Sequence, residues 1–225
     1  MRRVTAVIFD CDGVLFDSRR ANTLFYNHIL ARFGLPPMKK QEEGFVHMHT
    51  AEESIRHIFR GTPYEKQAQM YRMEMDYSPF IQDMVVEPDL MELLRLLKPQ
   101  FGLAVATNRS NTISEVLRRH GLEGLFDIVV SSVDVRYPKP HPESVFKILR
   151  FFRIGPEEAL YVGDSLVDSE TAKAAGVDFV AYKNPRLAAD HHVSRLKDIA
   201  EVVGMKASGL RGQGLGIRTW GQGDS

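Results

Sequence analysis

Cysteine is nearly absent from this chain of 225 residues, which contains only one, Cys11. A single cysteine excludes an internal disulfide, and this composition is typical of proteins from a reducing compartment. No apolar run approaches the roughly 20 residues that a membrane-spanning helix needs. The apolar run behind the charged residues 1–3 is too short for a signal peptide. We therefore expect a cytoplasmic protein without a membrane partner.

Excess charge of one sign is also lacking. The 29 Lys and Arg residues are balanced by 29 Asp and Glu residues, so the formal net charge is +0. A chain without net charge has no general attraction to nucleic acid or to an anionic lipid surface. Any binding site for an anion must therefore be local, and we expect no nucleic-acid partner.

Short apolar runs alternate with helical patterns over most of the chain, and 44% of the residues are hydrophobic. The runs predict strands at residues 4–9, 102–106, 127–131, 159–162 and 177–182. Helical patterns cover residues 89–98, 111–120, 142–153 and 167–175, with Asn111 as a predicted N-cap and Gly121 just after that helix. The alternation predicts an α/β fold, a Rossmann-like parallel sheet with helices on both faces. Ligands bind such sheets at the carboxyl ends of the strands.

Residues 19–84 interrupt the alternation, because no strand pattern occurs there. Helical patterns cover residues 19–33, 54–60 and 64–77, and Thr50 with Glu53 has the spacing of a capping box. Gly44 interrupts a helical pattern, so residues 42–49 are predicted to form a loop. We therefore expect a core of residues 1–17 and 86–208, and a small helical unit of residues 18–85 inserted after the first strand.

Glycine recurs from residue 209 onward, and this tail also holds the only tryptophan, Trp220. Such a composition loses much chain entropy on ordering, which predicts a flexible tail over residues 209–225. The alternative is an interaction segment anchored by Trp220.

Charged and polar residues stand where predicted strands end. Asp10 and Asp12 follow the first strand, and Gly13 lets the backbone turn sharply there. Burying two unpaired carboxylates at the end of a core strand is unfavourable, so they need a cation, a proton, or both. Thr107, Asn108 and Arg109 follow a second strand, Lys139 lies in a proline-rich loop, and Asp164 and Asp168 follow a third strand.

These residues, in this order, resemble the four motifs of the haloacid dehalogenase superfamily, most of whose members are Mg²⁺-dependent phosphatases. Asp10-x-Asp12-Gly13-Val14 is similar to motif I and Thr107 to motif II. Lys139 is similar to motif III, and the segment from Gly163 to Asp168, Gly-Asp-Ser-x-x-Asp, to motif IV. The inserted helical unit matches the small helical cap of these phosphatases.

The resemblance implies a mechanism. Mg²⁺ would bind a carboxylate oxygen of Asp10, the backbone carbonyl of Asp12, and Asp164, with Asp168 as a further or water-mediated partner that also orients Lys139. Asp10 would attack phosphorus to form an aspartyl-phosphate. Asp12 would transfer the proton. Thr107, Lys139 and the loop amides up to Gly13 would bind the phosphoryl oxygens, with Asn108 and Arg109 beside them.

The resemblance favours a phosphoglycolate-phosphatase-like hydrolase of a small phosphorylated metabolite, acting as a monomer or homodimer. Pyrophosphatase is one alternative. A phosphosugar mutase of the β-phosphoglucomutase type is another, although Asn22 stands at about the position of that branch's histidine. A non-catalytic protein that binds a partner through its tail is the weakest alternative. His47, His49, Arg20 and Arg56 are candidate substrate contacts from the cap, and of these we expect His47 to belong to the site.

Overall fold

Six parallel strands form one sheet in the order β5-β4-β1-β6-β7-β8. The computed structural model describes residues 4–205, and the predicted tail at 209–225 lies outside this range. The strands are β1 (Ala6–Phe9), β4 (Gly102–Ala106), β5 (Ile128–Val130), β6 (Ala159–Gly163), β7 (Asp178–Tyr182) and β8 (His191–Val193). The α/β prediction is confirmed and all five predicted strands are present. The edge strand β8 was not predicted, because its exposed His191 and His192 give it no apolar run.

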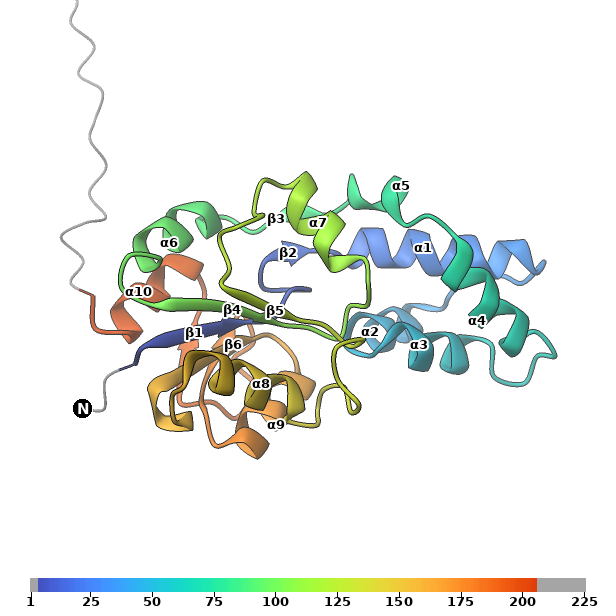
Figure 1. Ribbon diagram of the computed structural model, residues 1–225. Helices are drawn as coiled ribbons and strands as arrows, with labels where there is room; N and C mark the ends of the chain where they lie inside the picture. Colours follow the sequence, from blue (N-terminus) through green and yellow to red (C-terminus); the bar gives the residue numbers. More distant parts are fainter. Residues whose placement is uncertain (1–3, 206–225) are drawn as a thin grey trace, which may run out of the picture.

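Helices cover both faces of the sheet (Figure 1). One face carries α6 (Leu90–Leu97), α7 (Ile113–Arg119), the 3₁₀ turn Leu196–Asp198 and α10 (Ile199–Val202). The other carries α8 (Glu143–Phe152) and α9 (Leu166–Ala175), and a 3₁₀ turn, Pro156–Glu158, directly precedes β6. Strand side chains alternate between these faces: Val7 and Phe9 pack in the first cluster and Ile8 in the second. Strand β1 is therefore buried on both sides, as its continuous apolar sequence predicts.

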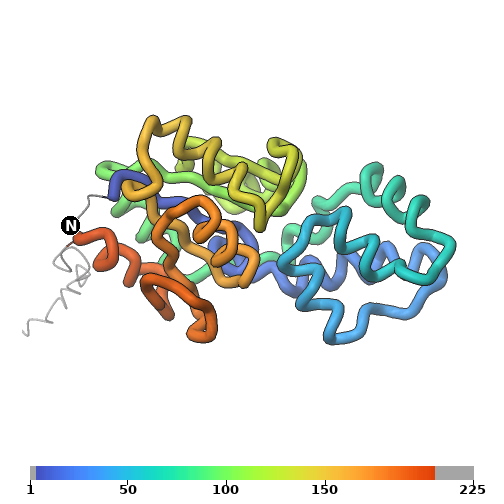
Figure 2. Tube along the Cα trace, turned by 90° about the horizontal axis from the view of Figure 1, so that it is seen from below, coloured from blue at the N-terminus to red at the C-terminus, as the bar shows by residue number. Residues whose placement is uncertain are grey.

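Five helices form the cap: α1 (Arg19–Arg32), α2 (Lys40–Met48), α3 (Ala51–Ile58), α4 (Glu65–Glu74) and α5 (Ser78–Ile81). The chain enters them through β2 (Phe16–Asp17) and returns through β3 (Val85–Val86). These two short strands pair antiparallel, with Phe16 opposite Val86, so both connections run side by side. Figure 2 shows the cap as a separate lobe beside the core. In residues 4–205, no helix is both long and apolar enough to span a bilayer.

Two local predictions in and near the cap are wrong. Residues 42–49 do not form a loop, because α2 continues through Gly44 and places Val46 in the core. Helix α7 begins at Ile113 with Thr112 as its N-cap residue, so Asn111 lies one residue too early and caps nothing. The capping box is confirmed: Thr50 accepts from the Glu53 amide, and Glu53 accepts from the Thr50 amide.

Candidate active site

Three neighbouring strands bring the predicted residues to one edge of the sheet. Asp10 follows β1, Thr107 follows β4 and Asp164 follows β6, and β1 lies between the other two strands. Lys139 reaches the same edge from the loop between β5 and α8. A cavity of about 670 Å³ opens here between the core and the cap, and all four residues line it.

Lys139 is the centre of a buried charge cluster. Its Nζ donates to Asp10 Oδ1 and to Asp168 Oδ1, both at 2.7 Å, and lies 3.1 Å from the Tyr161 hydroxyl. Burial alone would lower the pKa of Lys139, but the two carboxylates raise it well above its usual value. Burial raises the pKa of Asp10, and the nearby Asp168 raises it further. The ammonium is therefore held as a cation directly against Asp10.

Asp168 holds this lysine from the first turn of α9. Its Oδ1 accepts from Lys139 and from the Tyr161 hydroxyl at 3.1 Å. Its Oδ2 accepts from the Ser165 hydroxyl at 2.5 Å and from the Ser165 amide at 3.1 Å, in the reciprocal pattern of a capping box. Both carboxylate oxygens are thus engaged, and the ion pair with Lys139 is consistent with the predicted role of Asp168 in orienting that lysine.

Gly13 brings the motif I loop against Asp164. Its φ of +90° is a conformation that L residues with side chains rarely adopt. A Cβ atom there would lie 2.2 Å from Asp164 Oδ2, so only glycine permits this approach. Burial raises the pKa of Asp164 to about 7, and Asp168 adds to this rise.

Three carboxylates at this edge fit a divalent cation. One oxygen each from Asp10, Asp164 and Asp168 lie within 4.8 Å of one another. Hard, anionic oxygen ligands of this kind suit Mg²⁺. Burial first, and then the neighbouring carboxylate of Asp168, raises the pKa values of Asp10 and Asp164, and a bound cation would offset this clustered negative charge.

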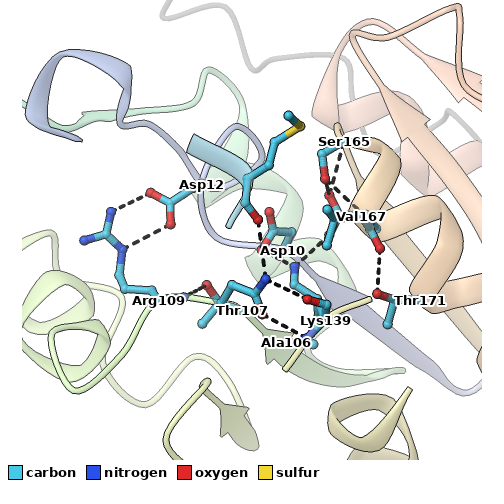
Figure 3. A network of polar contacts seen from close by, with 12 residues as sticks. Asp10, Asp12, Ala106, Thr107, Arg109, Lys139, Ser165, Val167 and Thr171 are labelled. Carbon is cyan, nitrogen blue, oxygen red and sulfur yellow. Dashed lines mark hydrogen bonds and ion pairs between the residues drawn. The ribbon is translucent and has the colours of Figure 1, made fainter. Parts of the chain in front are cut away.

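Asp12 faces away from this cluster and pairs with Arg109. Arg109 Nη2 lies 2.5 Å from Asp12 Oδ1, and Arg109 Nε lies 3.2 Å from Oδ2, a bidentate pair (Figure 3). Burial opposes ionisation of Asp12, but Arg109 prevails and the pKa of Asp12 is lowered. The guanidinium also lies over the Tyr77 ring at 5.1 Å and 3.4 Å from Asn22 Oδ1, so it contacts the cap.

Thr107 and Asn108 organise the loop after β4. The Thr107 hydroxyl accepts from the Arg109 amide at 3.0 Å and lines the cavity. Asn108 also lines the cavity, but its amide group binds the backbone of Lys139 in both directions, at 2.9 and 3.0 Å. Asn108 therefore positions the lysine loop and leaves less capacity for the predicted contact with substrate.

The predicted cap contacts divide into two groups. His47 and His49 line the cavity. His47 Nδ1 lies 3.5 Å from Asn22 Nδ2, and burial lowers the pKa of His47. Arg20 and Arg56 do not line the cavity: Arg20 pairs with Asp83, and Arg56 pairs with Glu52 on the exposed surface. The prediction of these two arginines as substrate contacts is therefore wrong.

Sequence reasoning missed three residues at the site. Tyr161 bonds both Lys139 and Asp168, Tyr77 supports Arg109, and Arg72 on α4 lines the cavity. A buried tyrosine hydroxyl needs a polar partner, so the position of Tyr161 in a core strand was a usable signal. Arg72 gave no signal, because it lies in a helix of mostly polar residues.

Comparisons with known proteins agree with this geometry. The family model described as haloacid dehalogenase-like hydrolase matches residues 7–182. The chain is 29% identical to the pyrophosphatase PpaX of Bacillus velezensis, over 91% of this chain and 99% of that protein. It is 30% identical to the phosphoglycolate phosphatase of Aquifex aeolicus, over 76% and 80%.

A solved structure has the same fold with higher identity. It is a haloacid dehalogenase superfamily hydrolase, subfamily IA, from Geobacter sulfurreducens. It has a TM-score of 0.74 and 40% identity, covering 89% of this chain and 97% of the other. Together with the motif residues gathered at one sheet edge, these matches show that the chain belongs to the haloacid dehalogenase-like hydrolase family.

Proposed function

We propose that this hydrolase is a Mg²⁺-dependent phosphatase that acts on a small phosphorylated metabolite through an aspartyl-phosphate on Asp10. The observation that carries the proposal is the position of Asp10. Its carboxylate pairs with the Lys139 ammonium, lies near the carboxylates of Asp164 and Asp168, and lines the cavity between the core and the cap. A carboxylate held in this way is oriented for attack and needs only a phosphoryl group above it.

Asp10, Asp164 and the backbone carbonyl of Asp12 would hold Mg²⁺, with Asp168 supporting the set. The bound ion supplies positive charge that offsets the clustered carboxylates and the phosphoryl group. The remaining positive charge comes from the chain itself: Lys139 lies 2.7 Å from Asp10 and stabilises negative charge beside it. Thr107 and the loop amides of Cys11 and Asp12 would donate to the phosphoryl oxygens. The Gly13 amide does not contribute as predicted, because it donates to the Phe16 carbonyl at 2.7 Å.

Asp12 would move the proton. In the proposed reaction Asp12 first separates from Arg109 and takes up a proton from solvent. Asp10 then attacks phosphorus, the bond to the leaving oxygen breaks, and Asp12 protonates that oxygen. Asp12 then removes a proton from the water that hydrolyses the aspartyl-phosphate, which regenerates Asp10. Both steps use one carboxyl group that lies two residues from the nucleophile and also lines the cavity.

The names of the relatives support two substrate types, a phosphomonoester such as phosphoglycolate and a phosphoanhydride such as pyrophosphate. A mutase is disfavoured, because Asn22 has no acid–base group and its amide oxygen already accepts from Tyr77 at 3.2 Å. The cytoplasmic location and the monomeric or dimeric state stay predictions.

Phosphate release from a panel of small phosphomonoesters and pyrophosphate tests the proposal. We expect release with Mg²⁺, none with EDTA, and none from Asp10→Asn. Asp17→Asn is the matched control, because Asp17 is an exposed aspartate in the same segment and its replacement should retain turnover. Metal-independent release, or an active Asp10→Asn protein, would contradict the proposal.

A further inference from the structure

The cavity holds one cation that no carboxylate neutralises within residues 4–205. Three Lys and Arg side chains line it, namely Arg72, Arg109 and Lys139. Lys139 pairs with Asp10 and Asp168, and Arg109 pairs with Asp12. Arg72, near the end of α4, forms no ion pair in this part of the chain, and its one hydrogen bond runs from Nε to Gln69 Oε1 at 3.3 Å.

Arg72 is nevertheless held in place. Gln69, which receives the Nε bond, donates through its own Nε2 to the Glu52 carbonyl at 2.8 Å and so ties α4 to the start of α3. Burial raises the pKa of the cavity-lining Tyr26 to about 12, and Arg72 is among the charges that oppose this rise. Arg72 lines the same cavity as Tyr26 and belongs to α4, so it lies on the cap side of the cavity.

The acidic residues near this end of the cavity are engaged elsewhere. Glu52 pairs with Arg56 at 2.7 Å, and Asp76 accepts from the Ser78 amide at 2.8 Å. The two terminal nitrogens of Arg72 make no hydrogen bond within residues 4–205. A half-buried guanidinium with free donors is suited to a carboxylate or phosphate, which it binds in a bidentate manner.

We propose that Arg72 binds an anionic group on the leaving-group side of the substrate, so that the preferred substrate is a phosphorylated acid or a phosphoanhydride. This inference rests on the proposed function, because it assumes that the phosphoryl group binds at Asp10. Arg72 would act on specificity and leave the chemistry to the core residues: the core holds the transferred phosphoryl group, and the cap selects what is attached to it.

Matched substrate pairs test the inference. 2-Phosphoglycolate and 2-hydroxyethyl phosphate differ by a carboxylate against a hydroxymethyl group, as do 3-phosphoglycerate and glycerol 3-phosphate. We expect the wild type to prefer an acid over its neutral partner by about 10-fold or more in kcat/KM, the effect typical of a charged hydrogen bond. Arg72→Gln should remove this preference through KM, and Arg72→Lys should retain part of it.

Lys66→Gln is the matched control, because Lys66 is exposed on the same helix as Arg72 but lies outside the cavity, and it should keep the preference. Measuring KM for pyrophosphate as well shows which anion Arg72 binds. If Arg72→Gln raises KM for pyrophosphate alone, Arg72 binds a phosphate group. If it raises KM for the phosphorylated acids alone, Arg72 binds a carboxylate. A wild type that treats both members of each pair alike, or an Arg72→Gln protein that keeps the preference, would overturn the inference.

Calorimetric binding to Asp10→Asn separates this inference from the proposed function. Binding needs no turnover, so the acids should bind Asp10→Asn more tightly than their neutral partners even where no phosphate is released. The double variant Asp10→Asn/Arg72→Gln should lose that difference. Equal affinities of Asp10→Asn for acid and neutral partner would contradict the role of Arg72, whatever the result for turnover.

Discussion

Asp12 and Arg109, which are 97 positions apart in the chain, form a buried bidentate ion pair with nitrogen–oxygen distances of 2.5 and 3.2 Å. Asp12 belongs to the loop after β1, and Arg109 to the loop after β4. Arg109 also touches Asn22 and Tyr77 of the cap. The carboxyl group that we propose as the proton carrier is therefore tied to the position of the cap. Before it can face a leaving oxygen, its pairing with Arg109 must loosen.

The ion pair predicts strong coupling in a double-mutant cycle. Arg109→Gln leaves the Asp12 carboxylate buried without a cation, and we expect it to lower the free energy of unfolding by about 3–5 kcal/mol. Adding Asp12→Asn should restore much of that loss, because the unpaired charge is then removed. Urea unfolding of the four proteins near neutral pH measures the coupling.

The exposed pair Arg56 and Glu52 serves as the control for this cycle. Its coupling should be small, since water screens both charges. If the Asp12–Arg109 coupling were no larger than that of the control pair, the two side chains would not form a buried ion pair in solution.

The raised pKa of Asp164 predicts that the metal-free protein loses stability as the pH rises. Its pKa is about 7 in the folded protein, against 3.8 for the ordinary carboxyl group, mainly because of burial and then Asp168. Between these values the folded state keeps a proton that the unfolded state releases, so unfolding becomes more favourable with rising pH. The loss is at most about 4 kcal/mol between pH 4 and 7, and it levels off above pH 7.

The comparison of wild type with Asp164→Asn in EDTA isolates this contribution, because asparagine imitates the protonated group. From pH 4 to 7 the free energy of unfolding of the wild type should fall steadily relative to that of Asp164→Asn. A difference that is constant with pH would show that Asp164 titrates normally in the folded protein.

The close approach of Gly13 to Asp164 predicts that a methyl group added at residue 13 disrupts metal binding. A Cβ atom at this residue would lie 2.2 Å from Asp164 Oδ2, so Gly13→Ala must displace that carboxylate. We expect Mg²⁺ affinity to fall by about 10-fold or more, the scale of effects reported for disturbed ligand orientation. The Mg²⁺ dependence of the melting temperature gives the affinity without any need for turnover.

Gly34→Ala is a close control. Gly34 also has positive φ, +67°, but a Cβ atom there meets nothing within 4 Å. Both variants carry the backbone strain of an alanine in this conformation, and only Gly13→Ala moves Asp164. Equal Mg²⁺ affinity of the two variants would contradict the proposed role of Asp164 as a metal ligand.

The sequence was sufficient for five of the six strands of the sheet and for the site residues that follow them. Asp10, Thr107 and Asp164 were predictable because each follows an apolar run, and parallel strands end at a common edge. The middle of helix α2 was not predictable, because Gly44 is a poor helix former. In the structure, burial of Val46 in the core outweighs that preference. The pairing of Asp12 with Arg109 was also hidden, since it depends on how two distant loops place their side chains.

Trapping the covalent intermediate tests the central claim most directly. Asp12→Asn should slow hydrolysis of the aspartyl-phosphate, and an activated donor such as acetyl phosphate needs little protonation of its leaving group. After acid quenching of this variant with acetyl phosphate and Mg²⁺, mass spectrometry should find the phosphoryl group on the peptide that contains Asp10. A phosphoryl group on another residue, or turnover by the wild type without phosphorylation of Asp10 in any quenched sample, would contradict the account.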